Sequence, residues 1–87
     1  HMVRLSASQI KYIEISGHRM VYHTTGGDVS AYGNLKEAEA SLDPAIFARC
    51  NSCYLVNLNY VQAIQGHTLL VDGDSLQISR PRRKAFV

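Results

Sequence analysis

The side chains best suited to chemistry gather at the end of the chain, in the stretch LQISRPRRKAFV. Four of the nine Lys and Arg residues fall within five positions, namely Arg80, Arg82, Arg83 and Lys84. The last eight residues carry a formal charge of +4, whereas the first 79 carry −2, from five basic and seven acidic side chains. Such a cluster can bind phosphates or acidic side chains, because both accept charge-assisted hydrogen bonds.

This basic segment has an anchor predicted on each side. Ser79 and Arg80 continue the strand-like run SLQIS, and the residues at 85–87 are apolar. We therefore expect a surface held by the sheet and by Phe86, with Arg80 fixed by the strand, rather than a solvated tail.

A second spacing that could do chemistry is Cys50-x-x-Cys53. A redox pair of this kind needs a cysteine at a helix N-terminus, but this pair leads into a strand-like run. Zinc would need two more ligands at suitable spacing, which the histidines do not provide. We predict two buried or half-buried structural thiols, no metal and no cofactor.

Catalytic motifs are equally scarce. No serine stands in a Gly-x-Ser-x-Gly turn, and no glycine-rich phosphate loop connects a strand to a long helix. The seven acidic residues fall mostly at predicted turns and helix starts, where capping explains them. The sequence therefore favours a binding module that is not an enzyme.

Composition sets the broad class. The chain has 87 residues, of which 46% are apolar and 18% charged, as in an ordinary globular domain. We read His1-Met2 as a cloning scar and expect one domain over 3–87, cut from a longer protein. No apolar run approaches the roughly 20 residues of a membrane span. Two closely spaced cysteines do not form a secreted disulfide framework, so we expect a cytoplasmic protein.

The first half of the chain predicts a three-stranded meander. Strand-like runs occupy 9–16, 17–25 and 29–33. The first two are joined by a short turn at Gly17-His18, and the last two by the Gly-Gly-Asp stretch at 26–28. His18 and Arg19 should therefore project from a hairpin tip, where they are either solvated or inserted into a groove of a partner.

Helical signals interrupt the strands after residue 33. Asn34 is a good N-cap, and Glu37 completes a capping-box pattern. The predicted helix spans 34–42, and its apolar stripe is made by Leu35, Ala38 and Leu42. A single further turn is expected at 43–47, with Asp43 as its cap, Pro44 in its first position, and Ile46 and Phe47 in the core.

The second half returns to strands. A long strand is predicted at 53–64, bent at Asn57 and Asn59, and a hairpin at 67–79 that turns at 72–74. Asn51 and Ser52 lie at the entry of the long strand, where they form either a turn or a contact with a partner. The predicted fold is mainly β: an elongated small β-sandwich made of meander, short helices and meander, with one or two short α-helices.

From about Ile10 to Phe86, the chain resembles the LytTR DNA-binding domain, the output module of many bacterial response regulators, including quorum-sensing ones. The similar stretches are IKYIEISGHRMVYHTTGG, YGNLKEAEASL, FARCNSCYLVNLNYVQAI and LQISRPRRKAF. The resemblance is carried by the order and spacing of these pieces over nearly the whole domain, most of all Phe47-x-Arg49 followed by Tyr-Leu-Val-Asn.

The resemblance implies that loops, rather than a recognition helix, meet DNA. The family's contacts match His18 in the first hairpin, Asn51 and Ser52 before the Tyr-Leu-Val-Asn strand, and Arg80 after the last strand. The middle loop departs from the family, which typically reads His-Arg-Ser or His-Asn-Ser there. Ser52 supplies only a short hydroxyl. Arg49 matches a family arginine whose role, internal pairing or DNA contact, stays open.

Elementary recognition chemistry agrees with that implication. An arginine can hold the O6 and N7 atoms of guanine with two parallel bonds, so Arg80 suits base reading. Three further cations suit phosphates, which fix register without reading sequence: Arg82, Arg83 and Lys84.

The expected partner is double-stranded DNA, bound at promoter direct repeats by a dimer on DNA. The resemblance also implies an N-terminal receiver domain in a two-component system. The alternative is a β-sheet protein-interaction module whose basic C-terminal surface binds an acidic partner or a membrane surface. An RNA-binding β-domain is less favoured, because it needs exposed aromatics on a sheet face and most of the tyrosines are predicted to lie in the core.

Overall fold

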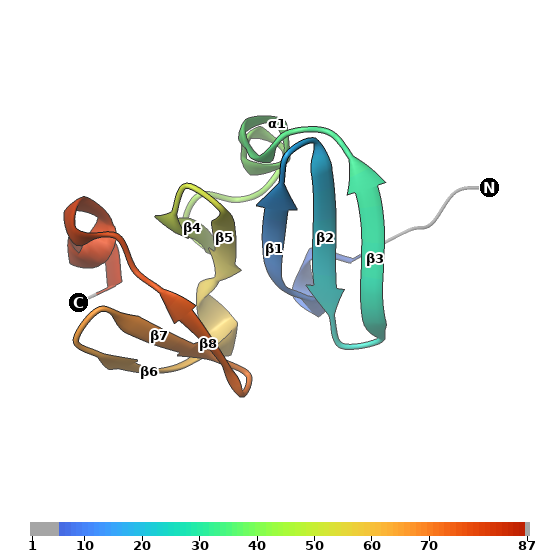
Figure 1. The fold of residues 1–87 in the computed structure, drawn as a ribbon. Helices are drawn as coiled ribbons and strands as arrows, with labels where there is room; N and C mark the ends of the chain where they lie inside the picture. Colours follow the sequence, from blue (N-terminus) through green and yellow to red (C-terminus); the bar gives the residue numbers. More distant parts are fainter. Residues whose placement is uncertain (1–5, 87) are drawn as a thin grey trace.

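The computed structural model describes residues 6–86, which form two antiparallel sheets joined by short helical turns (Figure 1). The first sheet has the strand order β3-β2-β1-β5-β4, and the second has the order β6-β7-β8. The molecule is elongated, measuring 41 × 23 × 21 Å. The predicted mainly β, elongated architecture is confirmed. The proposed scar at 1–2, the domain start at 3 and the apolar Val87 lie outside the described residues.

The elements follow one another in a simple order along the chain. The strands are β1 (Ile10–Ser16), β2 (Arg19–Thr24), β3 (Gly27–Tyr32), β4 (Phe47–Asn51), β5 (Tyr54–Asn57), β6 (Val61–Gln65), β7 (Thr68–Val71) and β8 (Asp74–Gln77). The helical elements are the 3₁₀ turns η1 (Ala7–Gln9), η2 (Leu58–Tyr60) and η3 (Arg80–Phe86), and the α-helix α1 (Leu35–Ala40).

The first meander forms as predicted. β1 pairs with β2 so that Ser16 faces Arg19, which leaves Gly17 and His18 as the turn. Gly17 adopts a φ of 65°, a left-handed conformation that glycine adopts without steric cost. β2 then pairs with β3 along its whole length. The hairpin tip therefore projects from the end of a well-paired sheet.

The predicted helix is present and is capped as expected. The Asn34 side chain accepts a hydrogen bond from the Glu37 amide at 2.8 Å. Leu35 and Ala38 are buried against the sheet, and the helix ends at Ala40, two residues earlier than predicted. α1 packs on β1 and β5.

The prediction for residues 43–47 was only partly right. The Asp43 carboxylate does cap a turn, accepting the Ala45 amide at 2.9 Å. Phe47, however, begins a strand, β4, which the sequence did not predict. Phe47 pairs with Asn57 across the β4–β5 hairpin and is buried. Pairing with β5 holds this segment in an extended conformation. Local sequence propensity does not predict that pairing.

The long strand predicted over 53–64 was wrong in one respect, because η2 divides it. Asn57 is buried, and its side chain accepts the Asn59 amide at 2.9 Å while donating to the Ile10 carbonyl at 2.9 Å. The expected bend at Asn57 is thus real. It is sharp enough that β5 belongs to the first sheet and β6 to the second.

Two apolar clusters support these sheets. The first lies between α1 and the inner face of the larger sheet and contains Ile10, Ile13, Met20, Leu35, Ala38, Phe47 and Leu55. The second joins the two sheets and contains Tyr12, Cys50, Val56, Leu69, Val71, Leu76 and Ile78. Phe86 packs against the second cluster, as predicted.

The prediction that a strand holds Arg80 was wrong. β8 ends at Gln77, and Arg80 is the first residue of η3. The segment between them is fixed by the Ser79 amide, which donates to the Cys50 carbonyl at 2.7 Å. The Arg82 amide then donates to the Ser79 carbonyl at 3.0 Å and begins the turn. The ending is anchored on both sides, but as a helical turn.

Candidate nucleic-acid interface

Antiparallel pairing places two of the predicted loops at the same end of the strands of the larger sheet. β1 lies antiparallel to both β2 and β5, so the β1–β2 turn and the β4–β5 turn lie at the same end of these strands (Figure 1). The Ile15 amide donates to the Cys53 carbonyl at 2.9 Å, which ties the β4–β5 turn to β1 close to the β1–β2 turn.

The β4–β5 turn also contacts the segment that leads into η3. The Asn51 side-chain amide donates at 2.7 Å to the carbonyl of Gln77, the last residue of β8. The three predicted contact regions therefore follow one another along a single rim. We call this rim the loop edge and define it by His18, Arg19, Asn51, Ser52, Arg80, Arg82, Arg83 and Lys84.

His18 and Arg19 form one part of the loop edge. Both are exposed. The His18 carbonyl accepts the Gly33 amide at 3.0 Å, so its backbone is fixed, while its imidazole makes no hydrogen bond within residues 6–86. Arg19 has only a long contact with the Ser30 hydroxyl, at 3.4 Å. The imidazole and guanidinium are thus available to a ligand.

The middle of the loop edge behaves differently. Asn51 uses its side-chain oxygen to accept the Cys53 amide at 2.7 Å, in addition to its bond to Gln77. Its amide therefore holds the turn, which is the first of the two roles considered for it. Ser52 is exposed, and its hydroxyl lies 3.8 Å from the Cys53 sulfur.

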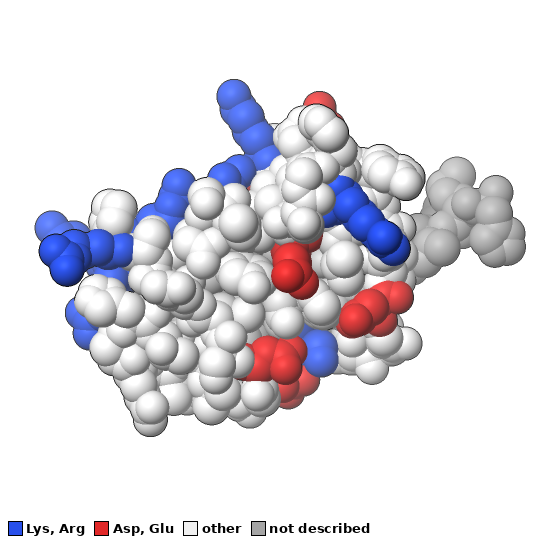
Figure 2. Space-filling view, in the orientation of Figure 1, with Lys and Arg blue, Asp and Glu red and all other residues white. Residues whose placement is uncertain are grey.

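The cations of η3 form the other end. Arg80, Arg82 and Lys84 are exposed, whereas Arg83 is half-buried and donates through Nε to the Gly66 carbonyl at 2.8 Å. Within the described part of the chain, none of the four forms a salt bridge with a carboxylate. Figure 2 shows Lys and Arg side chains gathered at this end of the molecule. Positive charge without internal partners raises the local concentration of an anionic ligand.

Arg49, whose role the sequence left open, is paired internally. Its Nε lies 2.9 Å from the Glu39 carboxylate, and the side chain is only 18% exposed. This pair ties β4 to α1. Arg49 therefore supports the sheet behind the loop edge.

The two thiols occupy different environments. Cys50 is fully buried on β4, and this burial raises its pKa to about 11. Cys53 is exposed, so the prediction of a buried or half-buried thiol was wrong for it, because it lies in the β4–β5 turn rather than in a strand. Among the residues that the structure describes, no three His, Cys, Asp or Glu side chains are arranged to hold a metal ion.

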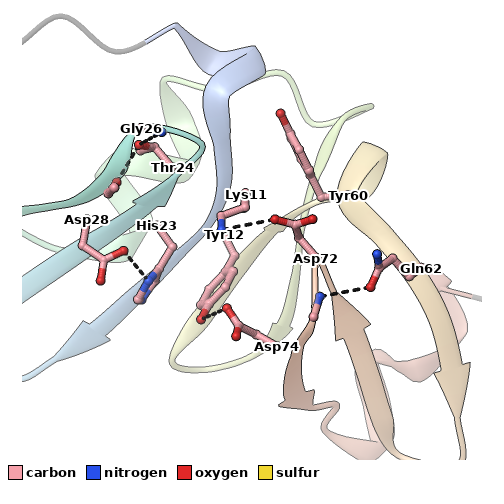
Figure 3. Close-up of polar contacts among 12 residues, drawn as sticks. Lys11, Tyr12, His23, Thr24, Gly26, Asp28, Tyr60, Gln62, Asp72 and Asp74 are labelled. Atoms are coloured by element: carbon pink, nitrogen blue, oxygen red, sulfur yellow. Dashed lines mark hydrogen bonds and ion pairs between the residues drawn. The ribbon is translucent and has the colours of Figure 1, made fainter.

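The opposite ends of the strands carry acidic residues that the sequence did not single out (Figure 3). The Tyr12 hydroxyl donates to Asp74 at 3.1 Å and its ring stacks on His23 at 4.3 Å. The His23 ring lies 2.9 Å from Glu14 and 3.0 Å from Asp28. Burial, with the Asp74 contact, raises the pKa of Tyr12 above its ordinary value. Of these contacts, only the one between His23 and Asp28 could have been predicted from the sequence, because the two residues lie opposite each other in the β2–β3 hairpin.

Together these features define a class of protein: a small elongated β-domain that presents cationic loops along one rim and contains no helix of groove-reading length in 6–86. The chain matches the LytTr DNA-binding domain family over residues 1–87. It belongs to that family and is a DNA-binding domain.

Structural comparison agrees about the fold. A solved chain from Bacillus cereus, described as the LytTr DNA-binding domain of a methyl-accepting/DNA response regulator, superposes with a TM-score of 0.81. The two share 24% identity, over 91% of this chain and 78% of the other. A search of curated proteins finds no match. No helix within residues 6–86 is long and apolar enough to cross a membrane.

Proposed function

We propose that this domain reads a specific double-stranded DNA sequence through the loop edge, as the output domain of a bacterial response regulator. The observation that carries the proposal is the alignment of three loop regions on one rim, with cations at the η3 end that have no carboxylate partner within residues 6–86. The domain itself performs no chemistry in this proposal; it binds and positions.

The dimensions support contacts in two successive major grooves. Successive major grooves on one face of DNA are about 34 Å apart. The molecule is 41 Å long; the β1–β2 tip extends from the first sheet, whereas η3 follows the last strand of the second. His18 and Arg19 would enter one groove and Arg80 the next. The β4–β5 turn, with Ser52 exposed, would face the DNA backbone between them.

The side chains divide the work according to their chemistry. Arg80 would read a guanine through two parallel hydrogen bonds. Arg82, Arg83 and Lys84 would hold phosphates, and of these Arg83 has the least freedom because Gly66 already accepts its Nε–H. Asn51 would act by holding the turn, so its contribution is positional.

Membership of the family supports a proposal about the wider biological setting. We propose a cytoplasmic transcription regulator with an N-terminal receiver domain, acting in a two-component system of the quorum-sensing type. We further propose that two copies bind promoter direct repeats as a dimer on DNA.

The test is selection of duplexes from a random-sequence library, followed by fluorescence anisotropy. The selected duplex should bind at least about a thousandfold more tightly than its scrambled version, as specific complexes do. Equal affinity for both duplexes, together with tight binding to an acidic polypeptide, would instead favour the protein-interaction alternative.

A further inference from the structure

A small pocket adjoins the base-reading arginine and has no role in the function described so far. It measures about 240 Å³ and is lined by His67, Gln77, Ile78, Ser79 and Arg80. None of these five residues is acidic. His67 comes from the β6–β7 turn, whereas the other four come from the end of β8 and the start of η3. The pocket therefore lies between two elements that are separated in sequence.

Backbone contacts fix the two walls relative to each other. The Ile78 amide donates to the His67 carbonyl at 2.7 Å. Arg83 contacts the same turn, donating to the Gly66 carbonyl at 2.8 Å. His67 and Arg80 thus face one pocket without any rearrangement. A site whose walls are already in place binds with less loss of conformational entropy.

The chemistry of the lining suits an anion. Arg80 is a permanent cation, and the exposed His67 ring can donate a hydrogen bond in either tautomer. The Ser79 hydroxyl, by contrast, is buried and has no hydrogen-bond partner within the described residues. A buried hydroxyl without a partner is unfavourable. Because that hydroxyl cannot be reached from the pocket, the hydrogen bond to an anion falls to His67.

We propose that this pocket binds a phosphate group of the DNA backbone next to the base that Arg80 reads, with the His67 ring donating the hydrogen bond to that phosphate and Arg80 contributing only its positive charge. The inference rests on the proposed function, because it places the pocket on the DNA side of η3. It adds a contact from the β6–β7 turn, which none of the loop-edge residues supplies. Since phosphates carry no sequence information, this contact should strengthen binding to all duplexes alike.

The test compares two substitutions at His67 with the same substitutions at Gln65, an exposed residue of the same hairpin outside the pocket. His67→Ala should weaken binding to selected and scrambled duplexes equally, by about threefold to tenfold. His67→Lys should strengthen both and steepen the slope of log affinity against log salt by about 0.9. Gln65→Ala and Gln65→Lys should change affinity by less than about twofold.

The outcomes separate the pocket from the general function. If the wild-type domain binds duplexes specifically but both His67 variants match it at every salt concentration, the pocket inference is wrong and the proposed function stands. If the wild-type domain shows no duplex preference, the proposed function fails first.

A second measurement identifies the source of the phosphate. Inorganic phosphate titrated into the wild-type domain should shift the His67 ring signals in NMR spectra saturably, and selected DNA should abolish that shift by occupying the pocket. A phosphate-induced shift that persists unchanged in the DNA complex would overturn the proposal, because the pocket would then hold free phosphate only.

Discussion

The two ends of the same strands are built from similar short turns but use their polar residues in opposite ways. At the acidic end, carboxylates are engaged inside the protein: Lys11 lies 3.2 Å from Asp72, Tyr12 contacts Asp74, and His23 contacts Asp28 (Figure 3). At the loop edge, none of the cations of η3 has a carboxylate partner in the described residues.

The difference shows which polar groups serve the fold and which serve a ligand. The contacts at the acidic end join the two sheets. Lys11 and Tyr12 belong to the first sheet, and their partners Asp72 and Asp74 lie at the β7–β8 turn of the second. Exposed ion pairs of this kind each contribute little stability, roughly 0–1 kcal/mol. The loop edge keeps its cations in place by backbone bonds instead, so their charges remain available for DNA.

Removing Arg80 should give the largest effect. Loss of a base contact costs about 1–3 kcal/mol and blurs one position of the site. Arg80→Ala should therefore lower affinity for the selected duplex strongly and for the scrambled duplex only weakly. Anisotropy with both duplexes measures the gap. If the Arg80→Ala protein kept its full preference for the selected duplex, Arg80 would not be the residue that reads the base.

His18→Ala tests the other end of the loop edge. Because the His18 imidazole makes no hydrogen bond in residues 6–86, its loss should change unfolding free energy by less than about 0.5 kcal/mol. Binding to the selected duplex should nevertheless weaken, by about 1 kcal/mol or more. Thermal melts and anisotropy on the same sample decide between the roles. Early unfolding with unchanged affinity would assign His18 to the fold.

The Tyr12→Phe substitution removes one contact at the acidic end and leaves the residues of the loop edge unchanged. The substitution keeps the buried ring and its stacking on His23 but removes the hydroxyl that donates to Asp74. Urea denaturation should show a loss of about 1 kcal/mol, the usual value of such a hydrogen bond. DNA affinity of the folded protein should be unchanged. A clear fall in affinity would mean that the two ends are coupled.

Among the substitutions at the loop edge, Arg82→Ala should have the smallest effect on affinity. Loss of one phosphate contact weakens selected and scrambled duplexes together and reduces the salt slope by about 0.9. Arg82 is a cleaner probe than Arg83, whose Nε also holds the β6–β7 turn through Gly66. Affinity measured from low to high salt gives the slope directly. A change confined to the selected duplex would show that Arg82 reads sequence.

Much of this protein could be predicted from the sequence, because the deciding signals are local. Alternating apolar residues and turn residues predict the first meander, and the Asn34 cap predicts the start of α1. The charge cluster at 80–84 and the apolar Phe86 likewise predict a basic surface with a buried end. These basic residues are close together in the sequence itself, so no structure is needed to recognise the cluster.

Only the tertiary structure decided how these pieces meet. The pairing of β1 with β5 brings the His18 turn beside Cys53, and the bond from Asn51 to Gln77 joins residues 26 positions apart. The internal pairing of Arg49 with Glu39, the strand at Phe47 and the 3₁₀ turn that begins at Arg80 were settled in the same way. Each depends on a contact between segments distant in sequence. Local propensity carries no information about such contacts, because the free energy that selects them comes from burial and pairing in the assembled sheets.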